Sequence, residues 1–209
     1  LDQGMMLHIK DMQMTDYTTI RVGIGSSRAP YILPVILELF RKHDTQTNIV
    51  VFELTTDEIK QRLLKSEIDI AISVYDTDSS HIESIKLFDE RILLCENSKK
   101  PNNCPIFPGE GQLLREVMNN VVAHNNSYSS NYIEVQNTET AVALVKAGLG
   151  FTVVPSYFEE FSFGDGLAYS ELPNSFSKKE RSISLMYRKD KTLKKEELFF
   201  LECAKEALS

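Results

Sequence analysis

Residues 20–40 read IRVGIGSSRAPYILPVILELF, and this stretch indicates the fold class. Its first six residues are mainly apolar and β-branched and end in glycine, which predicts a short strand. Ser26 and Ser27 then offer hydroxyls that can cap a helix, and Pro30 suits the first helical turn. Apolar side chains recur at helical spacing through the rest of the stretch, so a strand passes directly into a helix here.

The same unit is repeated along the next thirty-odd residues. Residues 48–54 form a second apolar stretch of strand type, and Thr56 is placed to cap a helix that ends near Leu64. Residues 69–74 are short and nearly all apolar, as expected for a strand that is buried on both faces. The order strand–helix–strand–helix–strand predicts a parallel sheet with right-handed crossovers, and hence an α/β protein.

The rest of the chain continues this alternation of strands and helices with one irregular region and no internal repeat. Expected strands are residues 82–88, 91–95, 121–123, 132–135, 151–154, 167–172 and 182–188; expected helices lie at 113–117, 138–147 and 191–208; residues 96–111 are expected to be irregular.

Net charge argues against nucleic-acid binding by these residues themselves. The 209 residues suit one large domain or two small ones and carry 23 basic against 30 acidic side chains, a net charge of −7. A chain that neutralises many phosphates needs a basic stripe, and the sequence contains none. We therefore expect no direct hold on DNA or RNA by this part of the chain.

Neither membrane insertion nor a disulfide framework is indicated. The densest apolar run, residues 32–37, is six residues long and contains a proline, whereas a membrane span needs about 18 apolar residues. Residues 1–6 lack the pattern of a secretory signal. The three cysteines are scattered without CxxC spacing, so we expect neither disulfides nor a zinc site, and a cytoplasmic location.

Polar residues at the ends of predicted strands are the candidate ligand contacts, because ligands of open α/β sheets bind outside the carboxyl ends of the strands. Ser26, Ser27 and Arg28 combine hydroxyls, a guanidinium and a helix N-terminus, which together suit an anion; helix capping with a solvated arginine is the alternative. Thr56 occupies the equivalent turn of the second unit, where capping alone is favoured. Tyr75 follows the third strand at the same edge.

A second group of polar side chains follows the strand expected at residues 121–123. Asn125, Asn126 and Ser127 are candidate ligand contacts there, although asparagine and serine are also common in exposed turns. The sequence is consistent with both a ligand contact and an exposed turn at these residues.

Catalysis finds little support in the sequence. The four histidines are scattered with no metal-ligand spacing, and no HExxH, GxGxxG, P-loop or GxSxG motif is present. Cys95 and Cys104 could form a redox pair, but a core position for Cys95 and a loop position for Cys104 are the simpler interpretation. We expect no catalytic residues, no metal and no cofactor.

Five motifs in order resemble the effector-binding domain of LysR-type transcriptional regulators over about residues 20–205. Ile24-Gly25-Ser26 closes the first strand, and Leu33-Pro34 precedes Leu37-Glu38-Leu39-Phe40 in the first helix. Residues 68–72 (IDIAI) and 87–90 (LFDE) match the third strand and a crossing strand of the family. The strongest match is the sequence ETA at 139–141 followed by VKAGLGFTVVP at 145–155.

The resemblance implies a periplasmic-binding-protein-like type II fold: two Rossmann-like α/β subdomains joined by two crossing strands. Subdomain I would comprise residues 20–89 and 182–209, and subdomain II residues 90–181. Residues 1–19 would be the tail of a linker or residues of vector origin.

The resemblance also implies an effector in the cleft between the subdomains. Its contacts would be Ser26 and Ser27 from the first strand–helix turn, Thr56 from the second, the loop at about residues 125–127, and Ile183 from the returning crossing strand. The position of Ile183 comes from the family alone.

The implied function is to sense a small, anionic metabolite (a carboxylate, an amino acid or another anion) and so to control transcription. DNA would be bound by a winged helix-turn-helix that is not in these residues, and such domains pair as homodimers or assemble as tetramers, with helix 30–42 against the partner. The peroxide-sensing members carry cysteines in the loop that here spans residues 125–130, which has none. A free-standing solute-binding protein of the same fold is the alternative.

Overall fold

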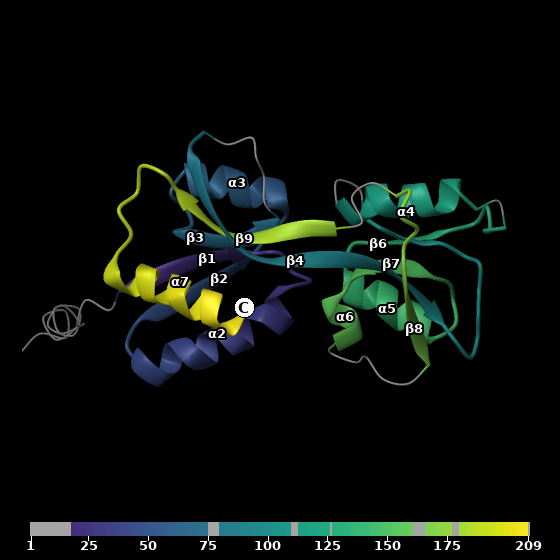
Figure 1. Ribbon diagram of the computed structural model, residues 1–209, viewed down its shortest axis with the longest axis horizontal. Coiled ribbons are helices and arrows are strands. Elements are labelled where there is room, and N and C mark those ends of the chain that lie inside the picture. The colour runs from purple at the N-terminus through teal and green to yellow at the C-terminus, as the bar shows by residue number, and fades with distance from the viewer. Residues whose placement is uncertain are drawn as a thin grey trace, which may run out of the picture.

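The computed structural model describes residues 18–74, 80–109, 113–125, 127–160, 166–176 and 180–208. Two halves lie side by side in Figure 1, and the long strands β4 (Ile82–Asn97) and β9 (Glu180–Arg188) lie in the middle between them. This arrangement confirms the α/β fold predicted from the sequence pattern and the crossing strands that the family resemblance implies.

The first half contains the repeated strand–helix unit. It consists of β1 (Thr19–Ile24), α2 (Ala29–His43), β2 (Asn48–Glu53), α3 (Thr56–Leu64), β3 (Ile70–Val74) and the C-terminal helix α7 (Lys195–Ala207). The strand order is β2-β1-β3-β9-β4, with β1 parallel to both β2 and β3 and with β9 antiparallel to β3. The carboxyl ends of β1, β2 and β3 therefore meet at one edge of the sheet.

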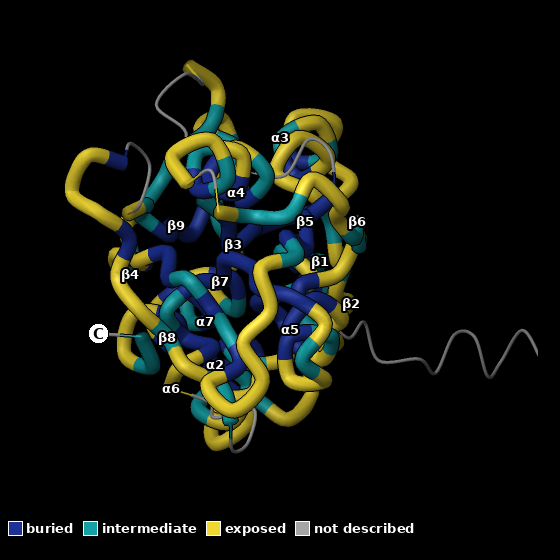
Figure 2. The backbone as a smooth tube through the Cα atoms, turned by 90° about the vertical axis from the view of Figure 1, so that its right-hand side faces the viewer, coloured by how far each residue is buried: buried dark blue, intermediate teal, exposed yellow. Residues whose placement is uncertain are grey.

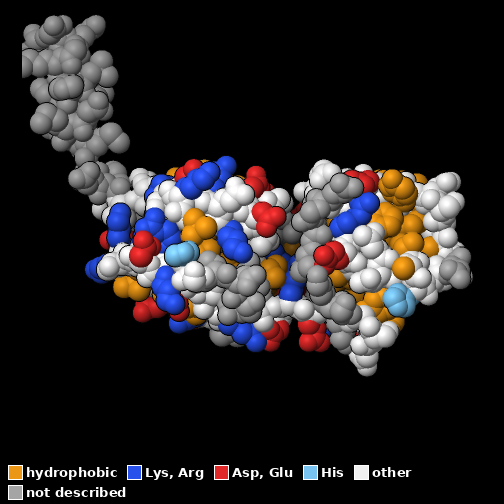
Figure 3. Space-filling view, turned by 90° about the horizontal axis from the view of Figure 1, so that it is seen from above, with side chains coloured by type: hydrophobic (Ala, Val, Ile, Leu, Met, Phe, Trp, Pro, Cys, Tyr) orange, Lys and Arg blue, Asp and Glu red, His pale blue; other side chains and the backbone are white. Residues whose placement is uncertain are grey.

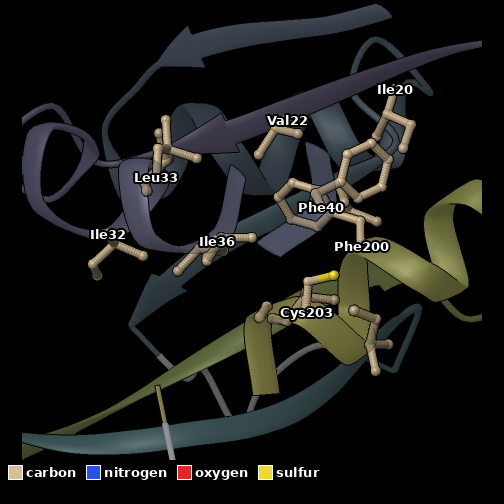
Figure 4. Packing of buried hydrophobic residues seen from close by; sticks show 14 of the residues in the cluster. Ile20, Val22, Ile32, Leu33, Ile36, Phe40, Phe200 and Cys203 are labelled. Atoms are coloured by element: carbon tan, nitrogen blue, oxygen red, sulfur yellow. The ribbon is translucent and has the colours of Figure 1, made fainter. Parts of the chain in front are cut away.

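Helices cover both faces of this sheet. On one face α2 and α7 pack against β1, with Ile36, Phe40 and Phe200 fully buried (Figure 4). The rings of Phe40 and Phe200 lie 5.9 Å apart. On the other face α3 buries Ile59 and Leu63. Two covered faces explain why the central strand β3 is nearly all apolar.

The second half is a smaller layered unit. It consists of β5 (Ile106–Pro108), α4 (Leu113–Ala123), β6 (Ile133–Val135), α5 (Thr138–Lys146), β7 (Thr152–Pro155), α6 (Tyr157–Glu160) and β8 (Leu167–Glu171). β7 and β8 both pair with β4, β5 is parallel to β6, and a single bridge between Pro105 and Phe151 joins the two sets. Two separate hydrophobic clusters lie against α4 and against α5 and α6.

β4 is shared by the two halves. Its first part, up to Arg91, pairs with β9, whereas Ile92 to Asn97 pair with β7 and β8. The pairing with β9 shifts register between Lys86 and Phe88. The sequence predicts two separate stretches here, at 82–88 and 91–95; the structure has one continuous strand.

Four further predictions are corrected by the structure. Residues 121–123, predicted as a strand, are the last turn of α4, because Val121 belongs to the face of that helix that packs into the core. The region 96–111, predicted as irregular, contains β5, and α6 was not predicted. The last helix begins at Lys195 rather than near residue 191.

Buried residues follow the strands and the inner helix faces, and exposed residues follow the connections (Figure 2). Basic and acidic side chains are interspersed on the face shown in Figure 3, and no continuous basic stripe crosses its described part. Within the described residues, no helix combines the length and apolarity that a bilayer span requires.

Candidate functional site

A cavity of about 330 Å³ lies where the carboxyl ends of the first three strands meet the second half. This volume is within the range of small-molecule sites. Both halves contribute to it. The lining residues are Gly25, Ser26, Ser27, Arg28, Glu53, Leu54, Thr55, Thr56, Glu58, Val74, Leu114, Gln136, Thr138 and Arg181.

The turn between β1 and α2 presents unused hydrogen-bonding groups to this cavity. Arg28, not a serine, occupies the N-cap of α2, and no side chain caps the helix. The predicted capping by Ser26 or Ser27 is therefore wrong. Within the described part of the chain, neither serine's backbone N–H has an acceptor. These groups are available to a ligand at the positive end of a helix.

The turn between β2 and α3 uses more of its hydrogen-bonding groups within the protein. Thr55, one residue before the predicted Thr56, caps α3 and forms a capping box with Glu58. Thr56 lines the cavity, and its hydroxyl oxygen lies 3.5 Å from that of Ser73. Only Thr56 therefore offers its hydroxyl to a ligand without disturbing the helix cap.

A buried ionic cluster joins the first turn to the crossing strands. The Arg28 guanidinium donates two hydrogen bonds to Glu90, at 3.2 and 2.8 Å, and Arg181 donates to the same carboxylate. The three side chains are 6%, 1% and 8% exposed for Arg28, Glu90 and Arg181. Two guanidinium groups thus share one carboxylate.

The pKa shifts in this cluster show which charges persist. Burial alone would raise the pKa of Glu90, but Arg181 and Arg28 hold it below its ordinary value, so Glu90 is ionised. Burial and the neighbouring Arg28 lower the pKa of Arg181 to about 10, which leaves it charged at neutral pH. The cluster therefore carries one positive charge in excess, and both arginines line the cavity.

An aromatic contact holds the same turn against the second half. The Tyr157 hydroxyl donates to the backbone carbonyl of Ser27 at 2.7 Å. The rings of Tyr157 and Phe158 lie 5.1 and 5.6 Å from that of Tyr31 on α2. Burial raises the pKa of Tyr157, which keeps the hydroxyl protonated as a donor.

The lining of the cavity also contains acidic side chains. Glu53, at the end of β2, is exposed and lines the cavity together with Glu58. From the second half, Gln136 follows β6, and the buried Thr138 begins α5. The cavity thus has arginines on one part of its lining and carboxylates on another.

The structure brings together only some of the sequence-predicted contacts. Ser26, Ser27, Arg28 and Thr56 line one cavity. Ile183 does not line it; its side chain is fully buried in the core of the first half. Tyr75 and Asn126 lie outside the described residues.

Asn125 and Ser127 lie away from this cavity. They follow the C-terminus of α4, and the neighbouring Ser129 N–H donates to the carbonyl of Asn103, just before β5. Gln136, at the opposite end of the parallel β5–β6 pair, is the residue that lines the cavity. Residues 121–123 are the last turn of α4, not a strand; Leu114, at the start of this helix, lines the cavity, and Asn125 and Ser127 follow its other end.

Four functional candidates escaped the sequence reasoning: Glu53, Gln136, Thr138 and Arg181. A signal for Thr138 was present, because Asn137 before a helix is a typical N-cap, and its side chain does accept from the Thr140 N–H. Arg181 lies next to a predicted strand, but nothing local distinguishes it. Among the described residues, no group of three or more His, Cys, Asp or Glu is arranged to hold a metal.

Comparison with known proteins identifies the family and the fold of the chain. The family model described as the LysR substrate binding domain matches residues 16–209. The Hca operon transcriptional activator HcaR of Escherichia coli is 23% identical over 173 residues, which cover 74% of this chain and 55% of that protein. The HTH-type transcriptional regulator EstR of Acinetobacter baylyi is 22% identical and covers 93% of this chain and 68% of its own length. The chain thus spans roughly half to two thirds of these relatives.

Solved structures show the same fold. An OxyR mutant of Corynebacterium glutamicum superposes with a TM-score of 0.72 at 22% identity, covering 98% of this chain and 69% of that chain. The effector-binding domain of a BenM variant superposes with a TM-score of 0.73 at 20% identity, covering 91% of this chain and 94% of that one. The match of the family model to nearly the whole chain shows that the protein belongs to the LysR substrate-binding domain family.

Proposed function

We propose that this chain is the sensing part of a transcription regulator and that a small molecule with a carboxylate or another anionic group binds in the cavity between its halves. The observation that carries the proposal is the excess positive charge of Arg28 and Arg181 over Glu90. A buried charge without a partner is costly, so a ligand anion that reaches Arg181 gains more than it would in water.

The neighbouring backbone supports the same ligand class. The free N–H groups of Ser26 and Ser27 lie at the N-terminus of α2, and α3 begins at Thr56 on the same cavity. Helix N-termini favour negative charge, by about 0.3–1 kcal/mol each. Two such termini and a charged guanidinium together select for an anion.

Regulation follows from the position of the cavity. Both halves line it, and β4 and β9 connect them. A ligand that binds one relative arrangement of the halves more tightly shifts the equilibrium toward it, and typical couplings are about 1–3 kcal/mol. We place the hinge near residues 89–90 and 181–182, with residues 20–89 and 182–209 on one side and 90–181 on the other.

The rest of the regulator is inferred from the relatives, which are longer than this chain. DNA would be contacted by a winged helix-turn-helix outside these residues, in the cytoplasm, and the ligand would be bound without chemical turnover. We propose pairing through α2 and the edge strand β2, where Val35, Val50 and Val51 are 37%, 41% and 38% exposed. Such pairing would form a homodimer, or a tetramer of two such pairs.

A thermal-shift screen tests the ligand class. Sulfate, phosphate and short mono- and dicarboxylates at matched ionic strength are expected to include at least one that raises the melting temperature. Arg181→Met should abolish that shift, whereas Arg91→Met, an exposed arginine paired with Glu171, should retain it. The proposal fails if no anion stabilises the protein, or if Arg181→Met keeps the full shift.

A further inference from the structure

The cavity carries opposite charges on two parts of its lining. Arg28 and Arg181 supply one positive charge more than Glu90 can neutralise. Glu53, at the carboxyl end of β2, supplies a negative charge. Among the described residues, no cationic side chain pairs with Glu53. A simple anion would satisfy the arginines and leave this carboxylate facing the ligand unneutralised.

Glu139, in the first turn of α5, is a buried carboxylate of the second half. Both of its carboxylate oxygens are buried, and within the described structure neither accepts a hydrogen bond of ordinary geometry, although its own backbone N–H and the Asn137 side chain lie near enough to lower its pKa. Burial raises the pKa of Glu139, and the charge of Glu53 raises it further, so the two carboxylates lie near enough to interact. Since Glu53 and Glu139 come from different halves, a cation close to both would relieve repulsion between the halves.

Glu58 also lines the cavity, but its carboxylate is already hydrogen-bonded within the protein. Its carboxylate accepts from the backbone N–H and from the hydroxyl of Thr55, both at 2.8 Å. These bonds commit it to the start of α3. Among the carboxylates that line the cavity, the negative charge available to a ligand is therefore that of Glu53.

We propose that the effector is a small zwitterion of the amino-acid type, with its carboxylate toward Arg181 and its ammonium group toward Glu53. This inference rests on the proposed function, since it assumes that the cavity takes an anion. It adds a second recognition element, which selects against carboxylates that lack an amine. Glu53 is the residue that determines this specificity, because it is the carboxylate of the lining without a bond to its own helix or strand neighbours.

Isothermal titration with matched ligands tests the inference. The standard L-amino acids are titrated first, and each binder is compared with its des-amino acid and its decarboxylated amine, for example L-leucine with 4-methylpentanoate and 3-methylbutylamine. We expect at least one amino acid to bind, and both analogues to bind about tenfold or more weakly, as expected for the loss of one charged hydrogen bond.

Two variants separate recognition of the amine from recognition of the anion. Glu53→Gln is expected to weaken the amino acid by about tenfold and to leave the des-amino acid nearly unchanged, because only the former carries an ammonium group. Glu202→Gln is the matched control: Glu202 is an exposed glutamate of α7, which does not line the cavity. It should alter neither affinity.

The outcomes distinguish this inference from the proposed function. If the des-amino acid binds as tightly as the amino acid, or if Glu53→Gln weakens both ligands equally, the zwitterion is refuted while the anion site stands. If neither amino acids nor carboxylates bind, both proposals fall. Selective loss of amino-acid affinity in Glu53→Gln alone supports the assignment.

Discussion

Replacing Glu90 by glutamine should destabilise this protein far more than an average point mutation. The Glu90 side chain is 1% exposed and is the shared acceptor of Arg28 and Arg181. Its neutralisation leaves two buried guanidinium groups facing each other without a counter-charge. Breaking a buried ion pair from one side costs about 3–5 kcal/mol, which for a chain of this size corresponds to a drop of roughly 6–20 °C in melting temperature.

Replacing Arg181, which donates to Glu90, should destabilise the protein much less than replacing Glu90 itself. Arg181→Met removes the excess charge and leaves Arg28 and Glu90 as a one-to-one pair, so its cost should be about 1 kcal/mol or less. The double variant Glu90→Gln/Arg181→Met removes one of the two buried charges that Glu90→Gln leaves without a counter-charge, and it should be more stable than Glu90→Gln alone. Additive effects would mean that the two sites do not interact.

Differential scanning calorimetry of the three variants, with urea unfolding as a second measurement, decides the matter. Glu171→Gln is a suitable control, because Glu171 forms an exposed ion pair with Arg91 and such pairs contribute about 0–1 kcal/mol. The account of a cluster with one positive charge in excess is refuted if Arg181→Met destabilises the protein as much as Glu90→Gln does.

Three further predictions concern other parts of the fold. Tyr157→Phe removes the hydrogen bond to the carbonyl of Ser27 and should lower the free energy of unfolding by about 1 kcal/mol; an unchanged urea midpoint would contradict this. The pKa of Asp69 is lowered to about 2: burial opposes the shift, but hydrogen bonds from basic side chains outweigh it. Its contribution to stability is therefore complete above the ordinary carboxyl pKa and is lost as the pH falls toward 2, so Asp69→Asn should flatten the acid limb of a stability–pH curve. Gly148→Ala should destabilise by about 1–2 kcal/mol, because Gly148 ends α5 at φ +79° and a Cβ there would lie 2.9 Å from that of Lys100; a melting temperature equal to that of the parent would refute the strain argument.

Local sequence patterns were sufficient to predict the helices and strands wherever one periodicity was clear. Residues 20–74 alternate between apolar strands and helices with caps, and the structure has the same five elements within one or two residues. The cap of α3 lies at Thr55 rather than Thr56, because Glu58 completes a capping box only from that position. Thr55 and Thr56 both carry a hydroxyl that can cap a helix, and sequence spacing alone does not distinguish between them.

The error at residues 121–123 had a larger consequence. Two adjacent valines favour a strand by propensity, but Val117 and Val121 lie one turn apart and are both buried in the same cluster. Tertiary packing overrides the local preference here. The start of α4 lies at the cavity and its last turn lies at the opposite end of the helix, so Asn125 and Ser127, which follow that turn, do not line the cavity.

Arg181 and Glu90 were beyond the reach of sequence reasoning for a different reason. They are 91 residues apart and are brought together by the register of the antiparallel pair β4–β9, in which they lie directly opposite each other. A change of one residue in that register would place the side chains on opposite faces. The charge of this site thus depends on long-range strand pairing, which neither composition nor periodicity encodes.

The net charge of the chain does not determine the charge at its cavity. The chain carries −7 overall, yet the base of its cavity holds one positive charge in excess. Surface carboxylates interact with Arg181 through water and salt, which screen charges beyond about 8–10 Å, whereas a ligand in the cavity meets it directly. In the proposed function the buried cluster attracts a small anion, while the acidic surface disfavours contact between these residues and nucleic acid. On that proposal one chain is repelled by DNA phosphates and still recognises a carboxylate, as a sensor that leaves DNA binding to another segment requires.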